Sequence, residues 1–276
     1  SQEKLLHEKE VAGRSAWVRL FDETLAHLRF ELDGDDKPLT EVLDQLTDKD
    51  AIKREAAGRA LAYSLRDNER IFSMITNTLA KDKEIEDRWR RFESPAHPRH
   101  LANHVETNVV EALVNAVRDS YSDLAHRYYE IKAGWMGVEK LDWWDRNAPL
   151  VVDEDNYIKW GKAKSIILES FSEFNPVMSD IANKFFKNNW IDAQVREGKA
   201  SGAFAHPSVP SLHPYILLNY QGKVRDVMTL AHELGHGIHQ VLASKQGLLL
   251  SDTPLTMAET ASVFGEMLLF RNLLNQ

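Results

Sequence analysis

The sequence contains no cysteine among its 276 residues. This absence excludes disulfide bonds, thiolate zinc sites and cysteine nucleophiles, and it fits a reducing compartment, so we expect a cytoplasmic protein. No apolar run approaches the ~18–20 residues that a membrane-spanning helix needs. Basic residues are also fewer than acidic residues: the chain has 34 Lys and Arg and 42 Asp and Glu, which gives a net charge of −8. We therefore expect neither a nucleic-acid nor a membrane partner, because both require clustered positive charge.

What is present is mainly helical periodicity. Hydrophobic residues make up 43% of the chain and charged residues 28%, the balance of a globular protein. Apolar residues recur at helical spacing through most of the first 190 positions. The segments predicted to be helical are residues 2–32, 40–46, about 50–65, 68–81, 107–132 and 159–188, the last one divided at Asn175-Pro176.

The pattern changes near Gly198. Residues 201–205 and 215–220 are short runs with aromatic or β-branched side chains, bounded by Pro and Gly, which is typical of strands. The predicted fold class is therefore mainly α, with a small β-sheet beside the helix that follows. We predict three regions: an N-terminal helical region (1–93), a second helical region (94–197) and a third region (198–276) that carries the chemistry.

That chemistry centres on the segment His232-Glu233-Leu234-Gly235-His236. If the segment is helical, positions i and i+4 share one face, so His232 and His236 can direct ring nitrogens at one ion. Glu233 is turned about 100° from His232 and reaches a water molecule rather than the ion. The surrounding residues are apolar almost all round, and buried histidine or glutamate is costly unless it is paired or coordinated. Two imidazoles, a general base and an open position are the parts of a zinc hydrolase.

A third ligand is needed to hold catalytic zinc. His239 shares the face of His232, but seven residues span about 10.5 Å of helix, too far for both to reach one ion. We expect His239 to support a ligand, face the substrate or simply pack. Glu259, on a second helical stretch that the loop 247–254 could fold back, is the better candidate. Glu266 lies seven residues further on the same face and either orients a ligand by a hydrogen bond or is a solvated surface residue.

Four segments resemble the oligoendopeptidase F branch of the thimet-oligopeptidase-like zinc peptidases, a zincin-like fold. They are residues 201–204, 213–220, the H-E-x-x-H helix and 258–262. The resemblance places the two histidine ligands, the general base and the glutamate ligand at His232, His236, Glu233 and Glu259. It implies one zinc ion and a zinc-dependent endopeptidase that hydrolyses internal bonds of short oligopeptides.

The same resemblance implies a peptide-binding role for Gly202 and Ala203. Both residues belong to a predicted strand, whose exposed edge can hold an extended peptide by main-chain hydrogen bonds. A glycine at position 202 also lets a substrate backbone approach closely.

The chain departs from this family at its C-terminal end. Family members place substrate-contacting tyrosine and histidine residues well beyond the glutamate ligand, whereas this sequence ends at Gln276. We therefore expect a central fragment whose catalytic region (198–276) is incomplete. The run 263–274 is apolar over most of the helix circumference, so we expect a missing C-terminal segment or a second chain to cover it. Two alternatives remain: a catalytically incomplete fragment that binds zinc and peptide, and a helical interaction domain whose motif is incidental.

Overall fold

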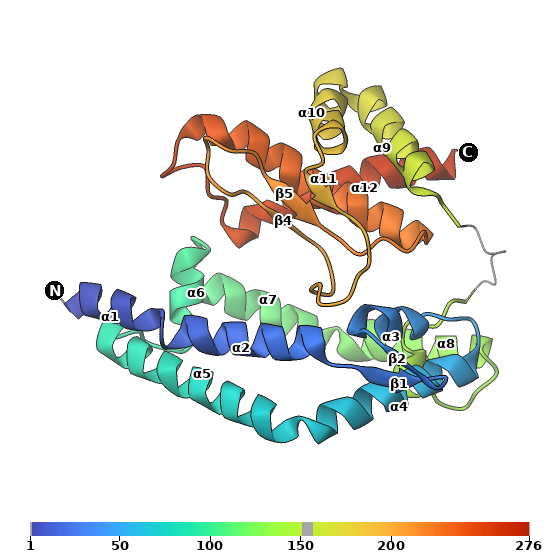
Figure 1. Cartoon of the computed structure of the whole chain (residues 1–276), viewed down its shortest axis with the longest axis horizontal. Helices are drawn as coiled ribbons and strands as arrows, with labels where there is room; N and C mark the ends of the chain where they lie inside the picture. The colour runs from blue at the N-terminus through green and yellow to red at the C-terminus, as the bar shows by residue number, and fades with distance from the viewer. Residues whose placement is uncertain (1, 151–156, 276) are drawn as a thin grey trace. The chain divides into compact units, whose positions relative to one another are not determined.

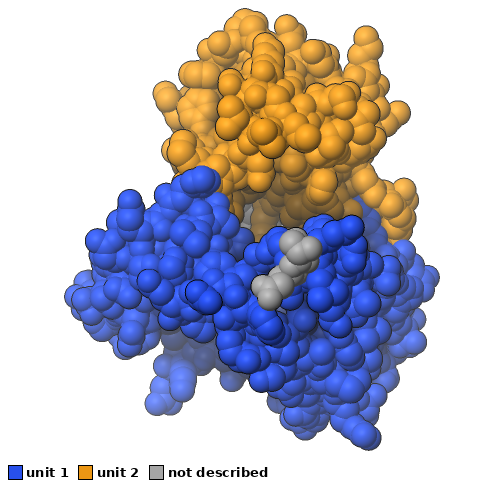
Figure 2. All heavy atoms as spheres, turned by 90° about the vertical axis from the view of Figure 1, so that its left-hand side faces the viewer, with its two compact units in different colours: residues 1–152, 197–200 blue, residues 153–196, 201–276 orange. Residues whose placement is uncertain are grey.

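The computed structural model describes residues 2–150 and 157–275. The chain forms two compact units, coloured separately in Figure 2: unit 1 comprises residues 1–152 and 197–200, and unit 2 comprises residues 153–196 and 201–276. The described residues are mainly helical with small sheets, which confirms the predicted fold class. The division into three regions stays a prediction. No helix in the described part of the chain is both long and apolar enough to cross a membrane.

Unit 1 is a set of helices with one β-hairpin (Figure 1). Its elements are α1 (Gln2–Glu10), α2 (Arg14–His27), β1 (Phe30–Leu32), β2 (Asp35–Lys37), α3 (Leu39–Gln45), α4 (Ala51–Asp67), α5 (Glu69–Arg90), α6 (His97–Ala102), α7 (Thr107–Asp119), a π-helical segment (Tyr121–His126), α8 (Arg127–Trp135) and a 3-10 turn (Trp143–Asp145). Its compact core lies where the hairpin packs on α3 and α4. The buried residues of that core are Phe30, Leu32, Val42, Ala57 and Leu61.

The hairpin corrects the prediction that residues 2–32 are helical throughout. Phe30 and Leu32 are buried while Glu31 between them is exposed, the two-residue alternation of a strand. Asp33 and Gly34 form the two-residue turn, both with positive φ (57° and 84°). An Asp-Gly pair favours this turn because its backbone twist matches that of the flanking strands. The local turn chemistry therefore overrides the helical periodicity on its N-terminal side.

A second difference concerns α5, which continues to Arg90 rather than ending near Lys81. Ion pairs one turn apart line its C-terminal half, including Lys83–Asp87 at 2.7 Å and Arg90–Glu86 at 2.8 Å. Such pairs add a few tenths of a kcal/mol each to an exposed helix. The helix ends at Arg91, which takes the left-handed conformation (φ 58°).

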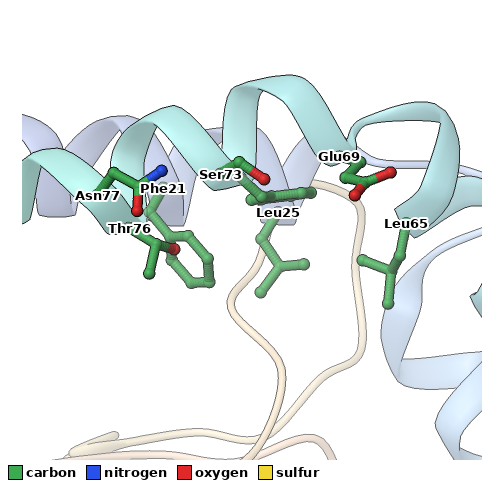
Figure 3. Close-up of a pocket in the computed structure, with 8 residues that line it drawn as sticks. Phe21, Leu25, Leu65, Glu69, Ser73, Thr76 and Asn77 are labelled. Atoms are coloured by element: carbon green, nitrogen blue, oxygen red, sulfur yellow. The ribbon is translucent and has the colours of Figure 1, made fainter.

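Unit 1 also contains a pocket of about 440 Å³ between α2 and α5 (Figure 3). Phe21 and Leu25 of α2 face Phe72 and Ser73 of α5 across it. Among the described residues that line it, Glu69 is the one ionisable group and no histidine is present. The pocket therefore offers no set of metal ligands.

Unit 2 carries the sequence motifs. Its elements are α9 (Trp160–Phe174), α10 (Pro176–Lys187), β3 (Ile191–Asp192), β4 (Phe204–His206), β5 (Tyr215–Leu217), α11 (Val224–Ala243), a 3-10 turn (Ser244–Gln246) and α12 (Leu255–Leu274). The predicted division between α9 and α10 is confirmed at Asn175-Pro176. The side chain of Asn175 accepts a hydrogen bond from the backbone of Val177 at 2.8 Å, and Pro176 occupies the first helical position.

The sheet of unit 2 has the order β3-β5-β4. β4 is antiparallel to β5, with Ala205 opposite Ile216, and β3 runs parallel to β5. β5 lies within the predicted segment 215–220, whereas β4 overlaps the segment 201–205 only at Phe204 and Ala205 and continues to His206. β3 has two residues, too few to show an alternation in the sequence. Because β4 is an edge strand of this sheet and packs beside α11, the sheet adjoins the H-E-x-x-H helix as expected (Figure 1).

The core of unit 2 lies between the sheet and the helices α9, α10 and α11. Its fully buried large side chains are Ile167, Phe171, Phe185, Ile216, Leu218, Val227, Leu230, Leu234 and Leu269. Each such side chain contributes about 1.5–3 kcal/mol relative to exposure. This packing holds one side of α11 in the core and so fixes the orientation of the H-E-x-x-H side chains on its other faces.

Candidate metal centre

The H-E-x-x-H motif lies on α11, and side-chain hydrogen bonds hold the first turn of this helix. Asp226, in the first turn, accepts hydrogen bonds from the backbone amides of Gln221 (2.8 Å) and Lys223 (3.0 Å). Val227, Leu230 and Leu234 are fully buried on the core side. His232 and His236 lie one turn apart on another face of the helix, with ring centroids 4.8 Å apart.

Two glycines let α12 cross α11 at very short range. A Cβ on Gly235 would lie 2.5 Å from the carbonyl oxygen of Ala261, and one on Gly265 would lie 2.7 Å from the carbonyl oxygen of Ala231. Real side chains do not approach backbone atoms this closely, so each position requires glycine. The crossing brings Glu259, one turn before this contact on α12, opposite the two histidines.

The three predicted ligands meet at one point. Oε2 of Glu259 lies 3.4 Å from Nε2 of His232 and 3.5 Å from Nε2 of His236. In the described part of the chain, these three residues are the one group of metal-ligating side chains whose ligand atoms all lie within 4.8 Å of one another. Two ligands about 2.1 Å from a tetrahedral ion lie roughly 3.4 Å apart, so the donor set and its spacing fit zinc. His239 does not belong to the group.

The two histidines differ in their surroundings. Nδ1 of His232 lies 2.5 Å from Oε1 of Glu266, a contact that leaves Nε2 as the nitrogen facing Glu259. This contact has the geometry that the orienting role requires, and the role of Glu266 stays a prediction. Burial lowers the pKa of His236, with Glu259 opposing the shift. A neutral imidazole is the form that binds a metal.

Glu233 lies outside the ligand group, on the side of α11 that faces β4. Its side chain is buried, and Oε2 has no hydrogen-bond partner among the described residues. Burial raises the pKa of Glu233 to about 7, while His232 and a hydrogen bond from the Ala205 backbone oppose the shift. A carboxylate with a pKa near neutrality can both accept and return a proton.

Two polar contacts around this site were not predicted from the sequence. The side-chain amide of Gln240, seven residues after Glu233, donates to the carbonyl oxygen of Ala205 at 3.2 Å and so ties β4 to α11. The hydroxyl of Ser262 donates to Oε2 of Glu259 at 2.7 Å. The i,i+3 spacing of Glu259 and Ser262 was a signal in the sequence that could have identified the second contact.

The proposed substrate residues, Gly202 and Ala203, lie just before β4. Gly202 is exposed with φ +84°, and its carbonyl oxygen accepts a hydrogen bond from the Asn219 side chain at 3.0 Å. A Cβ at Gly202 would meet nothing within 4 Å, so space is open beside this backbone. His239 instead lines a largely apolar pocket of about 540 Å³ together with Leu242 and Phe264.

A comparison with known protein families decides the affiliation. The model of peptidase family M3 matches residues 45–276, which include every residue of the metal-ligating group. The chain belongs to peptidase family M3. The family match begins within unit 1, so it extends well beyond the four segments that first suggested it.

Several M3 relatives are similar to this chain. Group B oligopeptidase PepB of Streptococcus agalactiae is 27% identical over 228 residues, and the chromosomal oligoendopeptidase F of Lactococcus lactis subsp. cremoris is 28% identical over 226 residues. These alignments cover 82% and 81% of this chain but 37% of each relative. The solved structure of PZ peptidase A with an inhibitor shares the fold, with a TM-score of 0.80 at 17% identity over 94% of this chain and 47% of that one. The chain thus spans less than half the length of these proteins.

Proposed function

We propose that this chain is the zinc-binding part of an M3 metalloendopeptidase that hydrolyses internal bonds of short oligopeptides. The observation that carries the proposal is the convergence of His232, His236 and Glu259 on one point, at spacings that suit one zinc ion. The names of the relatives, which include an oligopeptidase and an oligoendopeptidase, support oligopeptides as the substrate class. His232, His236 and Glu259 would hold the ion.

Zinc, when bound in such a site, polarises the scissile carbonyl and makes a water molecule more acidic. Glu233 would accept a proton from the attacking water molecule and deliver it to the leaving amine. The proposal draws on its buried carboxylate, whose Oε2 has no partner among the described residues, and on its pKa of about 7. General-base catalysis of this kind contributes typically ~10²–10⁴-fold to rate.

We assign peptide binding to the backbone just before β4, at Gly202 and Ala203. An extended peptide can pair with the backbone of an edge strand, which gives affinity without strict selection of side chains. Ala205 does not take part in such pairing, because its backbone already bonds Glu233 and Gln240. The carbonyl oxygen of Gly202 is also occupied, by the Asn219 side chain, so the assignment to Gly202 and Ala203 draws on the open space beside Gly202.

The alternative is a zinc- and peptide-binding fragment that lacks turnover. It is favoured by the exposed apolar side chains along α12, including Met257, Phe264, Met267 and Phe270, each more than 40% exposed. Patches of this kind normally mark interfaces. We propose that a further segment of an M3 peptidase, or a second chain, covers this face and supplies groups that complete the site.

The test compares the 276-residue chain with its Glu233→Gln variant. We expect both to retain one zinc per chain after dialysis, measured by elemental analysis, because Glu233 serves the water and not the ion. Cleavage of an internally quenched peptide by the wild type, lost in the variant, would support the endopeptidase. Stoichiometric zinc without turnover in either protein would support the alternative. Absence of bound zinc in the wild type would contradict both.

A further inference from the structure

Ser262 lies at the point where α12 meets α11. Ser262 is fully buried. A Cβ added to Gly235 would lie 2.8 Å from the Cα of Ser262, so Ser262 packs directly against the backbone of the H-E-x-x-H helix. Its hydroxyl lies 2.7 Å from Oε2 of Glu259 and 3.0 Å from the backbone oxygen of the same residue. This oxygen, Oε2, is also the Glu259 atom that lies 3.4 Å from Nε2 of His232 and 3.5 Å from Nε2 of His236.

We propose that Ser262 is a positioning residue that holds the carboxylate of Glu259 where it binds the metal. The inference rests on the proposed function, since it assumes that Glu259 is a ligand. It assigns a role to a residue that touches neither the ion nor the substrate.

The direction of the hydrogen bond follows from charge. A hydroxyl has one proton to donate, and both acceptors within reach belong to Glu259. A glutamate binds a metal as the carboxylate, and a hydrogen bond to an ionised acceptor is roughly twice as strong as one to a neutral carbonyl. The proton of Ser262 is therefore directed at Oε2, whose remaining lone pair stays available for the ion.

Glu259 needs such a restraint because its side chain is 54% exposed. A solvated glutamate samples several rotamers and loses that freedom when it binds an ion. Ser262, in contrast, is fixed by the helix crossing at Gly235. The hydrogen bond from this fixed hydroxyl therefore restricts the rotamers that the Glu259 carboxylate can adopt. Glu266 acts on a different ligand, His232, so the two contacts are separate.

The experiment measures zinc affinity of the full chain by competition with a chelator, for wild type and Ser262→Ala. The matched control is Ser170→Ala, which removes an equally buried serine hydroxyl of unit 2 that bonds the Ile166 carbonyl oxygen at 2.8 Å. Loss of a contact that orients a ligand typically weakens metal binding ~10–100-fold. We expect a loss of at least ~10-fold for Ser262→Ala and less than ~3-fold for Ser170→Ala.

A spectroscopic readout separates positioning from general destabilisation. We expect Ser262→Ala to alter the visible absorption bands of the cobalt-substituted chain, which report ligand geometry, and Ser170→Ala to leave them unchanged. In a Glu259→Ala background, Ser262→Ala should have no further effect on zinc affinity, because the serine acts through the glutamate.

Equal zinc affinity and equal cobalt spectra for wild type and Ser262→Ala would overturn the inference while leaving the proposed function intact. An undiminished effect of Ser262→Ala in the Glu259→Ala background would also overturn it, because the serine would then act by another route. A wild-type chain that binds no zinc would overturn both the inference and the proposed function.

Discussion

Replacing Gly235 by alanine tests whether the helix crossing sets the geometry of the metal centre. The added Cβ would lie 2.5 Å from the carbonyl oxygen of Ala261 and 2.8 Å from the Cα of Ser262. An ordinary contact to these atoms needs about 3.4 Å or more, so the shorter one falls about 0.9 Å short. Both neighbours are backbone atoms of α12, which cannot turn away as a side chain would. The two helices must therefore move apart.

The expected loss of stability follows from two opposing effects. Overpacking a tight contact costs about 1–3 kcal/mol, and two backbone contacts under 3.0 Å place Gly235→Ala at the upper end of that range. Alanine is a better helix former than glycine and returns about 1 kcal/mol. We expect a net loss of about 1–2 kcal/mol. The matched control is Gly161→Ala in α9, where a Cβ meets nothing within 4 Å, so stability should stay equal or rise by up to about 1 kcal/mol.

Gly235→Ala should also weaken zinc binding, because the ligands come from both helices. Ligand distances in a zinc site hold to within about 0.2 Å, so a displacement of several tenths of an ångström between α11 and α12 takes Glu259 out of range. We expect zinc affinity of Gly235→Ala to fall about 10-fold or more, and that of Gly161→Ala to be unchanged. Chemical denaturation of the metal-free proteins gives the stability, and chelator competition gives the affinity. Wild-type zinc affinity in a folded Gly235→Ala variant would refute the reasoning.

Four further substitutions extend the test. Glu259→Ala should lower zinc occupancy after dialysis far more than His239→Ala, and a greater loss from the His239 variant would contradict the proposed ligand set. Glu266→Ala should weaken zinc affinity about 10–100-fold, because Nδ1 of His232 loses the carboxylate at 2.5 Å; an affinity equal to that of the wild type would show that His232 needs no such partner. Gly237→Ala should cost stability but leave zinc affinity within about 3-fold of the wild type, because its Cβ would meet the ring of Phe185 at 2.6 Å rather than α12. A selective loss of zinc affinity in that variant would contradict this assignment.

The features that sequence analysis predicted well depend on local geometry. His232 and His236 are four residues apart on one helix, and helical geometry alone places them on one face. The division at Asn175-Pro176 was likewise predictable, because proline favours the first helical position and asparagine caps the helix before it. Each of these features needs nothing outside a few neighbouring residues.

The hairpin in unit 1 was missed although its signal is also local. The helical pattern of residues 2–32 extends over Phe30 and Leu32 and ends just before the Asp33-Gly34 pair. The pair in fact indicates two strands of matching twist on either side of it. The error came from assigning one period to a segment in which the period changes from 3.6 to 2 residues.

Spacing in the sequence does not predict the contact of Gln240, and for Ser262 it indicates only that the side chain is near Glu259. Gln240 bonds Ala205, a residue 35 positions earlier in the chain. That contact depends on β4 packing against α11 at one particular height, which periodicity does not specify. Ser262 was visible as a residue near Glu259, but its importance depends on its burial against Gly235, which is a property of two helices together.

The candidate metal centre is positioned by packing contacts on three different sides of α11. The core side, through Leu230 and Leu234, fixes the helix in unit 2. The α12 side admits a second backbone at Gly235 and so brings Glu259 within 3.5 Å of both histidines. The β4 side places the backbone of Ala205 against Glu233, where burial raises the pKa of the carboxylate. Helical spacing alone orders only the two histidines. The position of the proposed third ligand, Glu259, and the environment of the proposed base, Glu233, depend on how two other elements pack on the helix.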